Sequence, residues 1–174
     1  FDSLSKPEPQ IIDHTTQQLK LFPEIARGIA YQLATEYMWE KYDQTVAEIN
    51  AGQFGSMQEM HILSCALKVL CTTDACAGIE RLRMSCGGHG YLTATNIGNI
   101  YGNAVAAITY EGENTVLLVQ IGRFLVKQWH SLTEGKKMLP SMEYLARVNE
   151  MGDFPVWNDS WECIVQALQY AAAK

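Results

Sequence analysis

The residues from Tyr110 to Thr115, Tyr-Glu-Gly-Glu-Asn-Thr, combine a carboxylate and a glycine at the start of a long apolar stretch with helical spacing. A carboxylate withdrawn from water becomes a stronger base, whereas the N-terminus of a helix favours its ionised form. Acting together, the two effects would let Glu111 stay charged in a dry pocket and take a proton from a carbon next to a carbonyl. The alternative is a solvated acid that only favours the helix dipole, as acids in first turns generally do.

Upstream, the segment Cys-Gly-Gly-His-Gly-Tyr at residues 86–91 ends another apolar stretch. Gly87, Gly88 and Gly90 would let a ligand approach the backbone closely, and His89 could donate a hydrogen bond to it. Helices also commonly end in glycine, and His89 could equally be a surface residue. The run does not follow a strand and open a helix, so the dinucleotide-binding fingerprint does not apply. Together, the two segments suggest a cofactor-dependent proton abstraction.

Three polar residues, Gln17, Gln18 and Lys20, lie near the start of the first helical stretch. They either meet anionic groups of a ligand or form a solvated helix face, and the pattern alone favours the solvated face. Aromatic residues are frequent further along the same stretch, where they are typical of a core or an interface rather than of a cofactor site. They are Tyr31, Tyr37, Trp39 and Tyr42.

Composition excludes several classes of protein. The chain has 174 residues, of which 48% are hydrophobic and 18% charged, which is ordinary for one globular core. A net charge of −6 argues against nucleic-acid binding. The five cysteines are odd in number and lack zinc-site spacing, so we interpret them as small buried residues in a reducing compartment. No run of about eighteen apolar residues predicts a membrane span. The chain opens at Phe1 without an initiator methionine, and we expect a fragment.

Apolar residues recur every three or four positions along most of the chain, and nothing in it has the alternation of a β-sheet. The expected fold is therefore all-α: an antiparallel four-helix bundle with a further C-terminal helical segment. Residues 1–10 would be a lead-in, residues 11–136 the bundle, and residues 137–174 a linker and the start of a second helical domain. Helices are expected at about residues 11–49, interrupted or kinked at Pro23, and at 57–86, 97–104, 113–130, 144–148 and 160–174.

Four segments in this order and spacing closely resemble the peroxisomal acyl-CoA oxidases. They are residues 11–23, the glycine run at 86–91, residues 110–116, and Gly-Arg-Phe-Leu-Val-Lys at 122–127. The resemblance covers the chain from about Ile11 to Lys127. It implies that this chain is the third domain of such an enzyme together with the beginning of its last helical domain, and that the enzyme is peroxisomal.

The resemblance also implies a reaction. In that family the flavin of FAD takes a hydride from the β-carbon of a fatty acyl-CoA, a glutamate removes the α-proton, and O2 reoxidises the flavin to give hydrogen peroxide. The product is the trans-2-enoyl-CoA. Glu111 matches the catalytic glutamate, Tyr110 an aromatic position that lines the acyl site, and Gly112 a residue that leaves room for the thioester. The backbone N–H of the glutamate contributes to polarising the thioester carbonyl.

A homodimer is implied as well, because FAD crosses the subunit interface in this family. The backbone of residues 87–90 would approach the cofactor held by the partner. Gln17, Gln18 and Lys20 match a segment that contacts the partner's cofactor, and Glu113 matches a position that touches the flavin.

One departure concerns Met84, which stands where the sister group, the acyl-CoA dehydrogenases, usually has a glutamine. The Glu-Asn-Thr at residues 113–115 favours an oxidase over a dehydrogenase. Two alternatives stay open. One is a dehydrogenase that passes electrons to a protein acceptor, and the other is a catalytically silent helical module that dimerises through its apolar faces.

Overall fold

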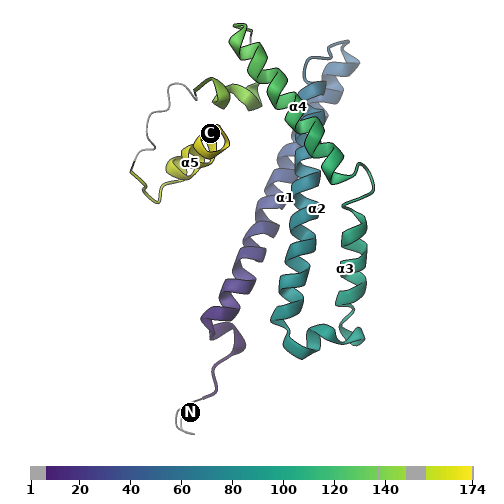
Figure 1. Ribbon diagram of the computed structural model, residues 1–174, viewed down its shortest axis with the longest axis vertical. Helices are drawn as coiled ribbons and strands as arrows, with labels where there is room; N and C mark the ends of the chain where they lie inside the picture. The colour runs from purple at the N-terminus through teal and green to yellow at the C-terminus, as the bar shows by residue number, and fades with distance from the viewer. Residues whose placement is uncertain (1–6, 137, 148–155, 174) are drawn as a thin grey trace. The chain divides into compact units, whose positions relative to one another are not determined.

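The computed structural model describes residues 7–136, 138–147 and 156–173. Within these ranges the chain is all-α, without strands, which confirms the expected fold class (Figure 1). Four helices of the expected bundle are present, and α5 is the expected C-terminal helical segment. Their bounds are α1 Thr15–Asn50, α2 Met57–Ser85, α3 Ile97–Ala106, α4 Asn114–Thr133 and α5 Trp161–Ala173, with 3-10 helices η1 Ile11–Asp13, η2 Gly87–Tyr91, η3 Thr93–Thr95 and η4 Pro140–Arg147.

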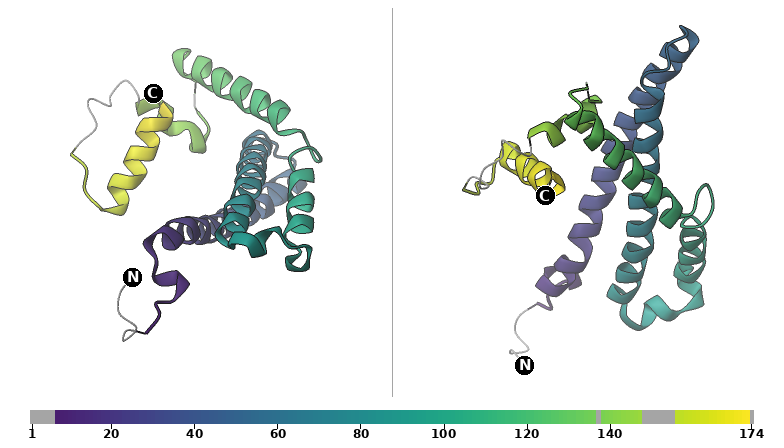
Figure 2. Two further views of the ribbon diagram at one scale, coloured as in Figure 1. Left: turned by 60° about the horizontal axis from the view of Figure 1, so that its bottom comes forward. Right: turned by 45° about the horizontal axis from the view of Figure 1, so that its top comes forward.

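The chain divides into two compact units, residues 1–119 and 120–174, with the boundary inside α4. In the first unit α1 and α2 form an antiparallel hairpin, and α2 lies between α1 and α3 (Figures 1 and 2). The short helices η2 and η3 turn the chain after α2, so that α3 runs back along it. Because α2 touches both neighbours, it is the element on which the rest of this unit is positioned.

Helix α1 continues without interruption through Pro23. The sequence allowed a kink or a restart there, because proline removes a backbone donor and its ring crowds the preceding turn, at about 3 kcal/mol. The restart does not occur. The next residue, Glu24, is bound to α2 through an ion pair with Arg81, and this packing holds the helix together on both sides of the proline.

The core of the first unit is built mainly from α2. Its buried apolar residues are Ile62, Cys65, Val69 and Cys76, joined by Leu117 from the start of α4. The apolar stripe of α1, in contrast, does not face α2. Its members are between 51% and 70% exposed; they are Leu19, Phe22, Ile25, Ile29 and Leu33. The hairpin therefore presents a long apolar face that its own residues leave uncovered.

In the second unit α4 ends near Gly135, which adopts a left-handed conformation with φ of 70°. A 3-10 helix, η4, stands where a short helix through Val148 was expected, and Val148 itself lies outside the described residues, as does most of the lead-in. Ser160 caps α5 by accepting a hydrogen bond from the N–H of Cys163 at 3.2 Å. Asn158 in turn accepts a hydrogen bond from the N–H of Ser160 at 2.9 Å.

Helix α2 is long and apolar enough to cross a membrane, which the sequence had not led us to expect. The core helix of a soluble protein meets the same criteria, so the finding is weak by itself. Two features favour a core helix. It packs against both α1 and α3, and its charged residues Asp74 and Arg81 form ion pairs with α1.

Candidate functional site

Residues 107–113 form the loop between α3 and α4, and Glu111 lies near its end. The N–H groups of Ile108 and Tyr110 donate to carbonyls in the last turn of α3 at 3.1 and 3.2 Å. Glu111 then takes a left-handed backbone conformation with φ of 57°, followed by Gly112 at 101°. For a residue with a side chain this conformation costs about 1–3 kcal/mol, so surrounding contacts must impose it. The side chains of Tyr110 and Glu111 are both exposed.

Two local features require a glycine at position 112. Its positive φ lies in a region that L side chains rarely adopt. A Cβ atom there would also lie 2.9 Å from Cδ2 of Leu117, a buried residue in the first turn of α4. The resemblance assigned Gly112 to making room for a thioester. The structure adds a reason within the chain itself, because a side chain at position 112 would be strained by the positive φ and would have to displace the side chain of Leu117.

Lys68, near the middle of α2, holds this loop. Its ammonium group donates to the carbonyl oxygen of Gly112 at 2.6 Å and to Oδ1 of Asn114 at 2.7 Å. The carbonyl oxygen of Ile108 lies at 3.5 Å. These acceptors come from both sides of Glu111 in the sequence. Sequence reasoning did not single out Lys68, although a lysine inside an otherwise apolar helical stretch was a visible signal.

Asn114, the first residue of α4, is buried and fastens the other side of the loop to α2. Its amide nitrogen donates to Oγ1 of Thr72 at 3.0 Å and to Oγ1 of Thr73 at 3.1 Å. Its backbone N–H donates to the carbonyl of Ile108 at 3.1 Å, which closes the loop on itself. Because the side-chain oxygen is bound to Lys68, both ends of the amide are satisfied, as burial of a polar group demands.

Glu113 caps α4. Its carboxylate accepts from the backbone N–H of Val116 and from Oγ1 of Thr115, each at 3.1 Å. Hydrogen bonds from the N–H groups of Thr115 and Val116, together with the charge of Lys68, lower the pKa of Glu113. The carboxylate that the resemblance places beside the flavin is therefore also engaged at the helix N-terminus, where a negative charge is favoured.

At the far end of α2, the glycine run is shaped by backbone packing. Gly87 ends the helix in the left-handed conformation expected for it, with φ of 58°. Gly90 is buried, and a Cβ atom there would overlap the backbone carbonyl of Arg83. Gly88 and His89 are exposed, and nothing lies within 4 Å of the place that a Cβ of Gly88 would take. The run thus has one glycine required by packing, Gly90, and two that are exposed with open space beside them, Gly87 and Gly88.

The three predicted polar residues near the start of α1 differ in their contacts. Gln17 is partly buried and donates from Nε2 to the carbonyl of Ser85 at 3.2 Å, which brings it beside the glycine run. Gln18 folds back onto its own segment and donates to the carbonyl of Ile12 at 2.9 Å. Lys20 is exposed. The structure therefore assembles Gln17 with the glycine run at one end of the hairpin.

The structure does not bring the two groups of predicted site residues together. Lys68, which holds the loop of Glu111, and Ser85, which contacts Gln17, are 17 residues apart on α2. At about 1.5 Å per residue, about 25 Å of helix separates them. Within one chain Glu111 and the glycine run therefore lie on two separate surfaces.

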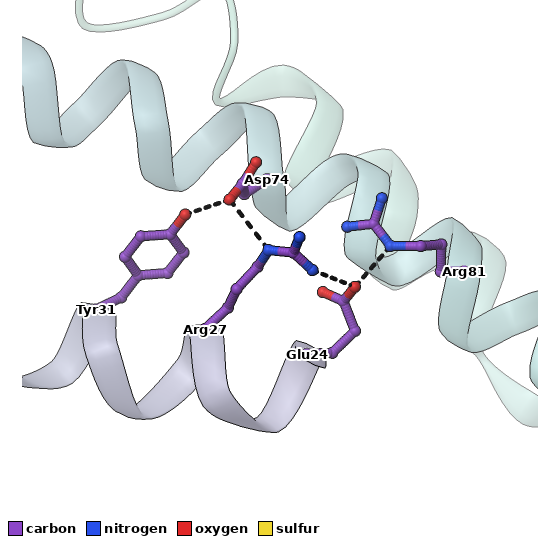
Figure 3. Close-up of polar contacts among 5 residues, drawn as sticks. All are labelled: Glu24, Arg27, Tyr31, Asp74 and Arg81. Atoms are coloured by element: carbon purple, nitrogen blue, oxygen red, sulfur yellow. Dashed lines mark hydrogen bonds and ion pairs between the residues drawn. The ribbon is translucent and has the colours of Figure 1, made fainter. Parts of the chain in front are cut away.

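Between these surfaces, a polar cluster joins α1 to α2 (Figure 3). The carboxylate of Glu24 forms ion pairs with Arg27 at 2.7 Å and with Arg81 at 2.6 Å. Asp74 forms an ion pair with Arg27 at 3.4 Å and accepts a hydrogen bond from the hydroxyl of Tyr31. Burial, then the hydrogen bond and the charge of Asp74, raise the pKa of Tyr31 to about 12. These contacts give Asp74, a charged residue on the otherwise largely apolar α2, its partners on α1. Because each carboxylate is paired with an arginine, the cluster fixes how α1 and α2 are aligned along each other.

Beyond the cluster, α1 and α2 line an open, largely apolar groove of about 410 Å³. Two of the predicted aromatic residues, Trp39 and Tyr42, lie in it with their rings edge to face and their centroids 5.8 Å apart. Lys68 also lines this groove, so the residue that holds the loop of Glu111 borders an apolar surface as well.

Comparison with known proteins agrees with these features. Residues 1–126 match the family model of the acyl-CoA oxidase C-alpha1 domain. The chain is 46% identical over 169 residues to acyl-coenzyme A oxidase 1 of Drosophila melanogaster, covering 97% of this chain and 25% of the relative. It is 44% identical over 141 residues to the peroxisomal acyl-coenzyme A oxidase 1 of Rattus norvegicus, covering 81% and 21%.

Solved structures give the same result. Acyl-CoA oxidase-1 of Caenorhabditis elegans in complex with FAD and ATP matches with a TM-score of 0.90 and 35% identity, over 99% of this chain and 27% of that one. Acyl-CoA oxidase 1 of Arabidopsis thaliana matches with a TM-score of 0.88 and 33% identity, over 95% and 26%. The chain spans about a quarter of the length of the relatives it matches. Sequence and structure together show that the chain belongs to the acyl-CoA oxidase family, with residues 1–126 corresponding to its C-alpha1 domain.

Proposed function

We propose that this chain supplies the catalytic base and part of the FAD site of a peroxisomal acyl-CoA oxidase, which oxidises a fatty acyl-CoA to the trans-2-enoyl-CoA and reduces O2 to hydrogen peroxide. The observation that carries the proposal is the conformation of Glu111. An exposed carboxylate stands on a loop fixed in the left-handed region, and Lys68 and Asn114 hold that loop from both sides. A solvated acid that merely favoured a helix dipole would need no such support.

In this proposal Glu111 removes the proton from the α-carbon of the acyl-CoA. Its carboxylate is exposed, so a substrate can reach it, and the anchored backbone fixes its direction. Tyr110, exposed beside it, lines the acyl site, and the backbone N–H of Glu111 helps to polarise the thioester carbonyl. Polarisation of the carbonyl acidifies the α-proton and so makes its transfer to the carboxylate easier.

The residues present fit a flavin cofactor. The backbone at Gly87 and Gly88 is exposed, and open space lies where a Cβ atom of either would stand, so a flat group can lie directly against it. When bound, FAD supplies the acceptor for the hydride that leaves the β-carbon. Backbone of residues 87–90 and the side chains of Gln17, Gln18 and Lys20 would hold its adenosine half, and Glu113 would lie near the flavin.

The loop of Glu111 and the residue Gln17 are held at points about 25 Å apart along α2, and this separation supports a homodimer in which each chain serves two cofactors. In that arrangement Glu111 acts beside one FAD, while the glycine run of the same chain contacts the FAD of its partner. Residues 11–136 would form the bundle domain of each subunit. The exposed apolar stripe of α1 offers surface for burial against the rest of the assembly.

The test is Glu111→Gln in the full-length enzyme. An amide keeps the shape of the side chain but cannot take a proton, so the rate of flavin reduction by acyl-CoA should fall by about 10²–10⁴-fold while the flavin stays bound. Stopped-flow absorbance measures the rate, and the visible flavin spectrum measures occupancy. Turnover at the wild-type rate would rule Glu111 out as the base.

Two alternatives have their own measurements. An acyl-CoA dehydrogenase would pass electrons to a protein acceptor, so the absence of hydrogen peroxide when the enzyme meets acyl-CoA in air would favour it. The exposed apolar stripe of α1 favours, as a second candidate, a silent helical module that dimerises through this face. Purification of the full-length protein without flavin absorbance, but as a dimer in sedimentation, would favour that module.

A further inference from the structure

Among the described residues, Lys68 is unusual in how its charge is used. The ion pairs found in these parts of the chain involve Arg27, Arg81, Arg83 and Lys136, and none involves Lys68. Its ammonium group instead donates to the carbonyl of Gly112 and to the amide oxygen of Asn114, both shorter than 2.8 Å. Lys68 is half-buried and its ammonium group donates to uncharged acceptors, so its hydrogen bonds hold this segment in place.

The segment that Lys68 holds contains a residue in an unfavourable backbone conformation. Glu111 has a φ of 57°, a conformation unfavourable for any residue with a side chain. The acceptors of Lys68 lie on either side of it, with Ile108 before and Gly112 and Asn114 after. Releasing them would let residues 108–114 relax to an ordinary backbone, and the direction of the Glu111 side chain would change with it.

The second half of the support comes from one turn further along α2. Thr72 and Thr73 accept the two amide hydrogens of Asn114, so that its oxygen is turned towards Lys68. Thr72 and Thr73 thus act on the loop through the buried side chain of Asn114, whereas Lys68 acts both through Asn114 and directly on the carbonyl of Gly112. We call Lys68, Thr72, Thr73 and Asn114 the loop anchor.

We propose that Lys68 is a positioning residue for Glu111: through Gly112 and Asn114 it fixes the left-handed backbone that aims the carboxylate. The inference rests on the proposed role of Glu111 as the base. It adds that a glutamate at position 111 is not sufficient for fast proton abstraction. The rate also depends on the ammonium group of Lys68 on α2, which takes no part in the chemistry itself. Misplacement of a reacting group by about 1 Å can lower a rate by about 10²-fold.

The main experiment compares Lys68→Met with the matched control Lys41→Met in the full-length oxidase. Methionine keeps much of the length of lysine but donates no hydrogen bonds. Lys41 lies on α1, with its ammonium group 5.8 Å from the centroid of the Tyr37 ring. We expect the rate constant of flavin reduction to fall by about 10- to 100-fold in Lys68→Met, with the affinity for acyl-CoA changed much less, and to be unchanged in Lys41→Met.

A deuterium isotope effect separates positioning from general damage. With acyl-CoA deuterated at the α-carbon, the effect on flavin reduction should be larger in Lys68→Met than in wild type, because abstraction of the α-proton has become the slow step. A crystal structure of the variant should show Glu111 outside the left-handed region. An unchanged rate constant and isotope effect, or an unchanged Glu111 backbone, would overturn the inference.

A second variant decides the question if Lys68→Met fails to fold or to hold flavin. Thr72→Val with Thr73→Val keeps side-chain shape but removes the acceptors of the Asn114 amide. We expect flavin reduction to be about 3- to 10-fold slower with a raised isotope effect, a fold-change comparable to the worth of one neutral hydrogen bond. A wild-type isotope effect there would refute the inference. Glu111→Gln serves as the reference: if that variant turns over normally the proposed base is wrong, whereas an inactive Glu111→Gln beside a normal anchor variant refutes only the role of Lys68.

Discussion

The loop of Glu111 and the glycine run at residues 87–90 both depend on α2, but α2 holds them by different means. Side chains anchor the loop, through Lys68 and through Thr72 and Thr73 acting on Asn114. The glycine run is placed by the absence of side chains, because Gly87 ends the helix and Gly90 fits against the carbonyl of Arg83. A group that must aim at an atom needs directional bonds, whereas a surface that must accept a flat ligand needs empty space.

The largest effect in this comparison should come from Gly112→Ala. The new side chain would be strained by the positive φ and would have to displace the end of the Leu117 side chain. We expect the free energy of unfolding to fall by about 1–3 kcal/mol and most of the activity to be lost. The apparent melting temperature and the rate of flavin reduction of the full-length variant measure the two losses. A variant that melts and reacts like wild type would show that the loop is far looser than its anchors imply.

Gly90→Ala and Gly88→Ala form a matched pair at the other end of α2. At Gly90 the added methyl group overlaps the backbone at Arg83, so we expect a loss of about 1–3 kcal/mol. At Gly88 it enters open space, so stability should change by less than about 0.5 kcal/mol. If a flavin lies against this backbone, Gly88→Ala should still release FAD more readily, measured by fluorescence of the free cofactor. Equal melting temperatures for the two variants would contradict the packing described for Gly90.

The smallest effect on stability concerns Glu113, whose carboxylate caps α4 at the end of the loop. Its pKa lies below the ordinary value of 4.5, so the stabilisation it gives is present above pH 4.5 and is lost as the pH falls through the lowered pKa. The melting temperatures of wild type and Glu113→Gln should therefore differ at neutral pH and converge in acid. Because the charge of Lys68 contributes to the shift, Lys68→Met should raise the pH at which they converge. A difference that is independent of pH would mean that the cap works without its charge.

Local signals in the sequence predicted most of the helix bounds. The periodic apolar residues and the glycines at positions 87 and 135 act within one or two turns, so the ends of α2 and α4 were predicted to within a few residues. The same signals misled at α1. Its apolar stripe was regular, and the proline suggested a break, but the helix is continuous and the stripe is exposed, because pairing with α2 runs through Glu24, Arg27 and Tyr31.

By itself the sequence determined the helical class, the family resemblance and the candidate residues around Glu111 and Gly87, since each rests on neighbours a few positions apart. Only the tertiary structure decided that these candidates form two surfaces along α2, and that Lys68 holds the loop of Glu111. The bonds of Lys68 join residues 40 to 46 positions apart, which no local spacing encodes. They exist because α3 returns along α2 and delivers the loop to the middle of that helix.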